Sequence, residues 1–246
     1  MIADLKSVVW KEWREQIMMH GSVTRWALNV LMIVGVLGVF LPWQFGPTAV
    51  ESISMLMWVW MPILLVMNSV ADAIAGERER HTLETLLASR LPDRAILFGK
   101  LIVPVVQASV IMLLAAVLAV ITVNLLHPAD HFRMYPPAVL FGLVTIPPLA
   151  GLLVAGAGVF ASTRAATVRQ AYQRMMIPIL AVVVLPSLGL ALLPRDLLAQ
   201  FYSLEFAQGG LLQFLLILAL ILLALDVLIL ALAARRFQRD RLLLDG

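Results

Sequence analysis

Long runs of apolar residues alternate with short polar segments along the chain. Six of these runs approach or exceed the roughly 20 residues that a helix needs to cross the hydrocarbon core of a bilayer. They cover about Trp26–Phe45, Ile53–Ala75, Leu101–Leu126, Ala138–Ala161, Met175–Leu193 and Leu211–Ala234. Pro178 and Pro186 interrupt the fifth run. The pattern predicts an all-α membrane protein whose residues 26–246 form six transmembrane helices.

The segment of residues 1–25 has the pattern of an amphipathic helix. An apolar side chain recurs every fourth residue, at Leu5, Val9, Trp13 and Ile17, and the charged residues mostly lie off this stripe. Tryptophan and basic residues beside an apolar stripe are typical of a helix that lies in the membrane interface. The segment is therefore predicted to be an interfacial helix, although a simple positively charged anchor fits the same pattern.

A second, shorter amphipathic helix is predicted in the loop of residues 76–100, between the second and third spans. Thr82 is a suitable N-cap, and Glu84 follows in the first turn, where the helix dipole favours an anion. Pro92 ends the helix. The apolar residues that share one face are Leu83, Leu86, Leu87 and Leu91. Such a face suits a groove on a soluble partner or packing against the chain's own helices.

The distribution of basic residues predicts the orientation in the membrane. Lys and Arg cluster before the first run, in the loops after the second and fourth runs, and after the last run. Only Arg133 and Arg195, of 18 basic residues, lie in the other three loops. Because cytoplasmic loops carry the excess of Lys and Arg, both ends of the chain and residues 76–100 are predicted to be cytoplasmic.

Composition supports the same fold class. The chain of 246 residues is 62% hydrophobic and 13% charged, whereas a soluble domain carries about 25% charged residues. The mean hydropathy is +0.96. The net charge of +3 comes with basic residues in alternate loops, so it indicates topology and not a nucleic-acid surface. The absence of cysteine excludes disulfides and thiolate metal sites.

Two acidic residues lie inside or near the predicted spans. Asp226 is in the last run, and no Lys or Arg lies within any run to pair with it. An intramembrane carboxyl group marks a functional site by default. The structural alternative is a hydrogen bond to a neighbouring helix through Asn29, Asn68 or Gln107. Asp72 is close enough to the cytoplasmic end of the second run to be hydrated, which favours a structural role.

Motifs for catalysis are missing from the sequence. There is no phosphate loop, no His-Glu-x-x-His and no Gly-x-Ser-x-Gly. His127 and His131 are four residues apart, but Pro128 disfavours a regular helix across them, so no metal site is predicted. The chain is predicted not to be an enzyme, and any ATP hydrolysis that drives it must occur on a separate chain.

Two segments resemble the permease subunits of type 2 ABC exporters. The run Glu77–Ser89, followed by Pro92 and Gly99-Lys100, is similar to their loop between spans two and three, which typically contains Gly-Thr-Leu-Glu-x-Leu-Leu. The sequence Lys-Glu-Trp-Arg-Glu at Lys11–Glu15 is similar to the start of their elbow helix. Two departures are His81, where the family usually has a glycine that permits positive φ, and Arg90-Leu91 before Pro92.

The resemblance implies a permease that pairs with a second copy or a related permease and binds two cytosolic ABC ATPases. ATP and Mg would be bound by those ATPases, in a bacterial or archaeal cytoplasmic membrane. The residues that it assigns to ATPase coupling are Glu77, Glu79, Thr82, Leu83, Glu84, Leu86, Leu87 and Leu91. Those that it assigns to the elbow helix are Trp10, Lys11, Glu12, Trp13, Arg14 and Glu15.

Two other classes of protein stay open at this point. An ion- or proton-coupled secondary transporter needs charged or unwound segments at the membrane midplane, where this chain has only Asp226. A non-transporting membrane scaffold needs neither a coupling helix nor an ATPase. ATP-dependent flux separates the exporter from both. The sequence does not indicate the substrate, although a mostly apolar pathway favours amphipathic cargo.

Overall fold

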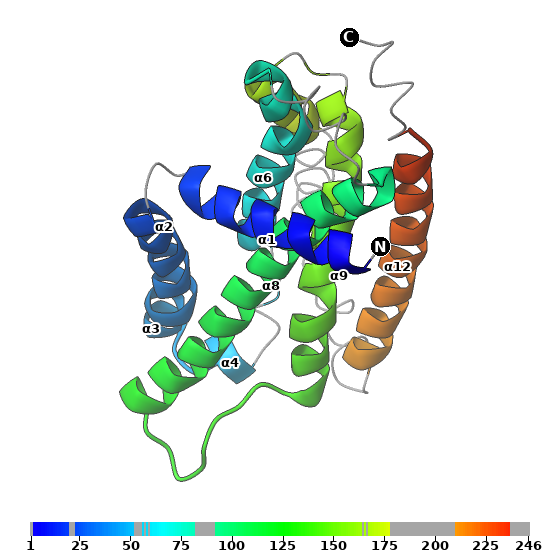
Figure 1. The fold of residues 1–246 in the computed structure, drawn as a ribbon. Helices are drawn as coiled ribbons and strands as arrows, with labels where there is room; N and C mark the ends of the chain where they lie inside the picture. The colour runs from blue at the N-terminus through cyan, green and yellow to red at the C-terminus, as the bar shows by residue number, and fades with distance from the viewer. Residues whose placement is uncertain are drawn as a thin grey trace.

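The computed structural model describes residues 2–19, 23–51, 56, 58, 60–81, 92–163, 165, 167–177 and 210–236. In these ranges the regular elements are helices, and no strand occurs. Figure 1 shows long helices side by side, with α1 running crosswise to α9 and α12. The predicted all-α class is confirmed for this part of the chain.

The helices have the following bounds. They are α1 (Ile2–Met19), α2 (Val23–Gly35), the π-helix η1 (Val36–Phe40), α3 (Leu41–Phe45), α4 (Thr48–Glu51), α6 (Trp60–Glu79), α8 (Asp93–Leu126), α9 (Pro137–Thr163) and α12 (Gly210–Arg236). Residues 168–177 are also helical.

Four helical stretches are long and apolar enough to cross a membrane. They are Val23–Phe45, Ala95–Leu126, Pro137–Val159 and Gly210–Ala234, and they match the first, third, fourth and sixth predicted spans. The second predicted span, Ile53–Ala75, overlaps α6, which begins at Trp60 and ends at Glu79. The last eight residues of α6 include Asp72, Glu77 and Glu79 and make it less apolar. Residues 178–193 of the fifth predicted span lie outside the described residues.

The first span is one continuous helical path with a π turn in its middle. Elements α2, η1 and α3 follow one another without a break from Val23 to Phe45. The Thr122 hydroxyl of α8 donates hydrogen bonds to the Gly38 carbonyl of η1 at 2.8 Å and to the Leu118 carbonyl at 2.9 Å. A side-chain hydroxyl therefore joins the first span to α8 at the irregular turn.

Helix α8 lies at the centre of the bundle. It packs against α1, α2, η1, α6 and α9. One apolar cluster, which includes Met67, Ile96 and Ala155, surrounds the end of the bundle where α6 ends and α8 begins. A second, which includes Leu37 and Met112, surrounds the opposite end. The end of α6 and the start of α8 therefore share one apolar cluster, and α1 packs on α8.

Candidate functional site: a buried ion cluster at the base of the α6–α8 loop

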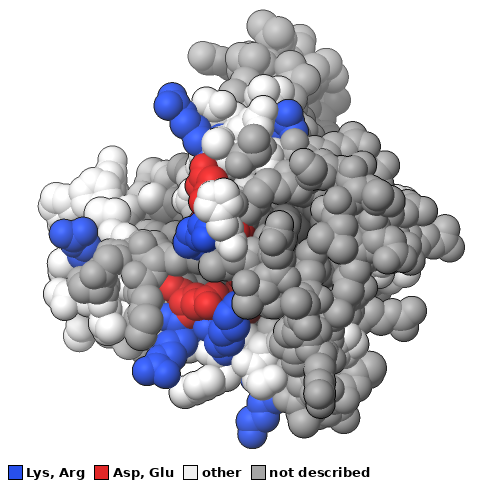
Figure 2. All heavy atoms as spheres, turned by 45° about the horizontal axis from the view of Figure 1, so that its top comes forward, with Lys and Arg blue, Asp and Glu red and all other residues white. Residues whose placement is uncertain are grey.

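Three helices bring charged side chains together at the end of the bundle that carries α1. Helix α6 ends there, α8 begins there, and α1 packs across α8. Figure 2, which turns the top of Figure 1 toward the viewer, shows acidic side chains lying beside and between basic ones on this face. The charges that the sequence places in separate segments are thus neighbours in space.

Lys100 of α8 is the centre of this group. Its ammonium donates a hydrogen bond to Glu77 Oε1 of α6 at 3.2 Å. It also lies 3.0 Å from Glu12 Oε1 of α1, as an ion pair that lacks hydrogen-bond geometry. The three side chains are only 5–8% exposed. Charged groups are seldom buried this deeply unless they are paired, so this contact fixes how the three helices meet.

Lys11 extends the group toward solvent. Its ammonium lies 3.4 Å from Glu15 Oε1, one helical turn away on α1, and 3.6 Å from Glu77 Oε1. We call Lys11, Glu12, Glu15, Glu77 and Lys100 the Lys100 cluster. It combines three carboxylates with two ammonium groups and joins α1, α6 and α8.

The charge state of Lys11 follows from its surroundings. Partial burial lowers the pKa of the Lys11 ammonium, but the carboxylates of Glu77, Glu15 and Glu12 raise it by more, so its pKa lies above the ordinary 10.5. A raised pKa in the folded state stabilises the fold below pH 10.5, and this contribution is lost only as the pH rises through the folded-state pKa. Lys11 is therefore charged at neutral pH.

The carboxylates of the Lys100 cluster are close enough together to suggest a cation site. One oxygen each from Glu12, Glu15 and Glu77 lies within 4.8 Å of the others. The ammonium groups of Lys11 and Lys100 approach these oxygens to 3.0–3.6 Å and already supply positive charge. We therefore assign the cluster as an ion-pair network and place no metal in it.

Glu79, the second predicted acidic residue before the loop, binds a different element. Its Oε1 accepts a hydrogen bond from the Val168 backbone N–H at 3.3 Å, at the first residue of helix 168–177. Thr167 Oγ1 accepts one from the Gln170 N–H at 3.2 Å, as an N-cap does. Glu77 and Glu79 thus fasten the end of α6 to α8 and to helix 168–177, respectively.

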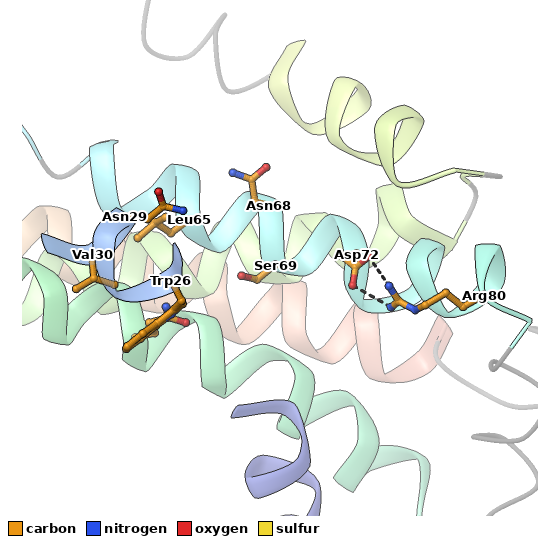
Figure 3. A pocket seen from close by; sticks show the side chains of 9 residues that line it. Trp26, Asn29, Val30, Leu65, Asn68, Ser69, Asp72 and Arg80 are labelled. Carbon is orange, nitrogen blue, oxygen red and sulfur yellow. Dashed lines mark hydrogen bonds and ion pairs between the residues drawn. The ribbon is translucent and has the colours of Figure 1, made fainter. Parts of the chain in front are cut away.

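Asp72 and Arg80 form an ion pair along α6, two turns apart. The Arg80 guanidinium donates to Asp72 Oδ1 at 3.2 Å and to Oδ2 at 3.0 Å (Figure 3). Gly76 lies between them, and a Cβ atom there would overlap the Asp72 carboxylate and lie 2.8 Å from Arg80 Nη2. The pair forms because position 76 has no side chain. The hydrogen bond to Asp72 raises the pKa of Arg80.

His81, one of the two departures from the family's usual sequence, lies in a backbone conformation that favours glycine. His81 has φ of +56°, the left-handed conformation that glycine adopts without strain. It directly follows Arg80, where the helix of α6 has ended. The turn is therefore the one that the family's glycine favours, with a non-glycine residue held in it.

Replacing His81 with glycine is expected to stabilise the protein by about 1 kcal/mol, because the left-handed conformation costs a non-glycine residue about that much. Thermal unfolding in detergent measures this. The matched control is His131→Gly, an exposed change on the opposite side of the bundle. A melting temperature for His81→Gly at or below that of the control contradicts the expectation.

The structure places the other predicted residues as follows. Trp10 and Arg14 are exposed on α1, and Trp13 is partly buried. The predicted coupling helix, with Thr82, Leu83, Glu84, Leu86, Leu87 and Leu91, lies outside the described residues. The described residues on its two sides end at His81 and resume at Pro92.

The face of α1 that contacts the protein differs from the apolar stripe seen in the sequence. Val8 and Glu12, one turn apart, are buried, whereas Val9 and Trp13 of the stripe are partly buried. Val8 packs where Gly99 of α8 leaves room, since a Cβ atom at position 99 would overlap the Val8 side chain. Sequence reasoning missed this contact.

Asp226 is buried on α12, at 1% exposure. Neither carboxyl oxygen has a hydrogen-bond partner in the part of the chain that the structure describes. The predicted hydrogen bonds to Asn29, Asn68 or Gln107 are wrong, because those side chains line a cavity bounded by α2, α6 and α8. Asp226 therefore does not belong to the Lys100 cluster or to that cavity.

Comparison with known protein families gives a match over most of the chain. A family model described as ABC-2 type transporter matches residues 3–198, which contain every member of the Lys100 cluster. No curated protein matches the chain.

Proposed function

The chain belongs to the ABC-2 type transporter family of membrane transport subunits, and from that premise we propose that it is the permease of an ATP-driven exporter. The permease would pair with a second copy or a related permease. Two cytosolic ABC ATPases would bind below the pair and supply the ATP and Mg. Both ends of the chain would be cytoplasmic, as the distribution of Lys and Arg predicts.

The observation that carries the proposal is the Lys100 cluster. Glu77 and Lys100 are 23 residues apart in sequence but in hydrogen-bond contact, so they close the loop at its base. Glu12 joins α1 to the same ammonium. This loop is closed at its base and held between packed helices. It can therefore pass a movement of a docked partner on to those helices, because the buried ion pairs resist separation.

The proposed coupling therefore has a defined route. The amphipathic helix predicted at Thr82–Leu91 would dock its apolar face on the ATPase. Movement of the ATPase would be carried through Glu77 into α6, through Lys100 into α8, and through Glu12 into α1. Glu79 would carry the same movement into helix 168–177. Residues Lys11–Glu15 act in this scheme as the elbow helix.

We expect a cytosolic ATPase to co-purify in equal amount with this protein from its native membranes in mild detergent. A Leu86→Asp, Leu87→Asp variant is expected to lose the ATPase, since two carboxylates in an apolar docking face cost several kcal/mol when buried. Mass spectrometry of the purified complex measures both. Size-exclusion chromatography and the melting temperature establish that the variant is folded.

The matched control carries the same kind of change on the opposite side of the bundle. Phe132 and Met134 are 69% and 58% exposed in the loop between α8 and α9. The Phe132→Asp, Met134→Asp variant is expected to keep the ATPase. If no ATPase is found even after crosslinking, the exporter proposal fails, and ion-coupled transport through Asp226 becomes the hypothesis to test.

A further inference from the structure

A cavity of about 390 Å³ lies between α2, α6 and α8, on the side of the bundle that carries α1. Figure 3 shows Trp26 and Asn29 of α2 facing the part of α6 that carries Leu65 and Ser69. Gln107 of α8 also lines the cavity. The Asp72–Arg80 ion pair lies at its end nearest the loop.

Several polar side chains line this cavity without forming a hydrogen bond to another described residue. The Trp26 indole N–H is buried and has no hydrogen-bond partner. Within the described ranges, no hydrogen bond is formed by the side chains of Asn29, Asn68, Ser69 or Gln107. Asn29 and Asn68 are exposed and Ser69 and Gln107 are half-buried, so among these described lining residues the Trp26 N–H is the buried group that lacks a partner. Buried polar groups are usually satisfied, and an unsatisfied one that faces a cavity with other polar side chains indicates a ligand.

The position of the cavity corresponds to the headgroup region of one leaflet. Trp26 and Asn29 lie three and six residues after Val23, where the first candidate span begins. At 1.5 Å per residue they are within about 10 Å of that end of the span. Leu28, between them, and Leu31 and Met32, further along α2, are exposed and would face the lipid. The cavity thus has a polar end near the loop and an apolar surface leading toward the membrane interior.

The chemistry of the lining favours a ligand rich in acceptors. The indole and guanidinium groups only donate hydrogen bonds, and each amide adds an N–H₂ donor. Asp72, the one carboxylate in the lining, already accepts two bonds from Arg80, which has five donor hydrogens and so keeps others free. A cationic ligand therefore meets no free carboxylate, whereas a phosphodiester and ester carbonyls would be bound.

We propose that this cavity binds the headgroup and glycerol ester region of a phospholipid from the leaflet on the α1 side. Arg80 would contact the phosphate, and Trp26, Asn29 and Gln107 would donate to the oxygen atoms below it. The acyl chains would follow the lipid-facing surface of α2. This site is separate from the Lys100 cluster and does not depend on the ATPase.

The experiment compares two lipids that share the acyl chains and the glycerol ester region but differ in the phosphoglycerol headgroup. The delipidated full-length protein is titrated with dioleoyl phosphatidylglycerol or with dioleoylglycerol, and its melting temperature is measured. Phosphatidylglycerol is expected to raise the melting temperature at concentrations at least about tenfold lower than dioleoylglycerol, because only it has a phosphate for Arg80. Equal potency of the two lipids overturns the proposal.

Variants locate the site. Trp26→Phe removes the buried N–H and leaves a smaller aromatic ring, and Asn29→Leu, Gln107→Leu removes two amides. Each is expected to weaken the response to phosphatidylglycerol at least about fivefold. Gln213→Leu, an exposed amide on α12, is the matched control and should respond as the unchanged protein does. If the double variant does not fold, Trp26→Phe decides alone, and an unchanged response there overturns the proposal.

Discussion

Replacing Lys100 with methionine is expected to destabilise the protein by about 3–5 kcal/mol, the cost of removing one member of a buried ion pair. Methionine keeps much of the side-chain length but removes the ammonium. The carboxylates of Glu12 and Glu77 would then lose their shared ammonium at the junction of α1, α6 and α8, where Lys11 lies 3.6 Å from Glu77 Oε1. Thermal unfolding of the purified protein measures the loss.

Two further variants show whether the ammonium is the cause. Lys6→Met makes the same change at an exposed position of α1 and should have little effect. Combining Lys100→Met with Glu12→Gln removes one of the stranded charges, so the double variant should lose less stability than the sum of the single ones. A loss for Lys100→Met no larger than that for Lys6→Met would show that the Lys100 cluster does not hold the three helices together.

The second large effect is expected at Gly99, where α1 crosses α8. Alanine favours a helix over glycine by about 1 kcal/mol, so without a contact Gly99→Ala would stabilise α8. The added Cβ atom would instead overlap Val8 of α1, and overpacking of this kind costs about 1–3 kcal/mol. The expected result is therefore a lower melting temperature, together with weaker ATPase binding, because displacing α1 draws Glu12 away from Lys100.

A change on the partner helix tests the contact directly. Val8→Ala removes the methyl group nearest to the added Cβ atom. The Val8→Ala, Gly99→Ala double variant should therefore be more stable than Gly99→Ala alone. Additive losses in the double variant would mean that the two positions do not contact each other.

The proposed function connects these two predictions. Both act on the base of the loop and leave the predicted docking face at Leu86 and Leu87 unchanged. Lys100→Met and Gly99→Ala are thus expected to weaken coupling while the ATPase can still bind weakly, whereas Leu86→Asp, Leu87→Asp removes binding itself. The ratio of ATPase bound to ATP-driven flux distinguishes a loss of coupling from a loss of docking.

The hydrophobic pattern within single segments was sufficient to predict these helices. A span needs about 20 apolar residues in sequence, so the first, third, fourth and sixth spans are visible without any tertiary information, and the structure confirms them as candidate spans. The helix of α1 is visible for the same reason, because its periodicity lies within one segment. The family is also recognisable from short segments, at Lys11–Glu15 and Glu77–Ser89.

The hydrophobic pattern could not predict contacts between residues that are distant in the sequence. Glu12 and Lys100 are 88 positions apart and meet only because α1 packs across the start of α8. In the sequence, Lys100 is merely a basic residue before an apolar run. Asn29, Asn68 and Gln107 were possible partners of Asp226 in the structural alternative, but helix packing places them around a separate cavity. Nothing in their own segments distinguishes these two arrangements.

The sequence by itself therefore determined the fold class, the candidate spans and the family, because these depend on composition and periodicity within single segments. Only the tertiary structure decided which charges pair, which face of α1 is buried, and that His81 adopts a left-handed conformation that favours glycine. Those features depend on how helices cross, and crossing is set by complementary shapes such as Val8 against Gly99, which no single segment encodes.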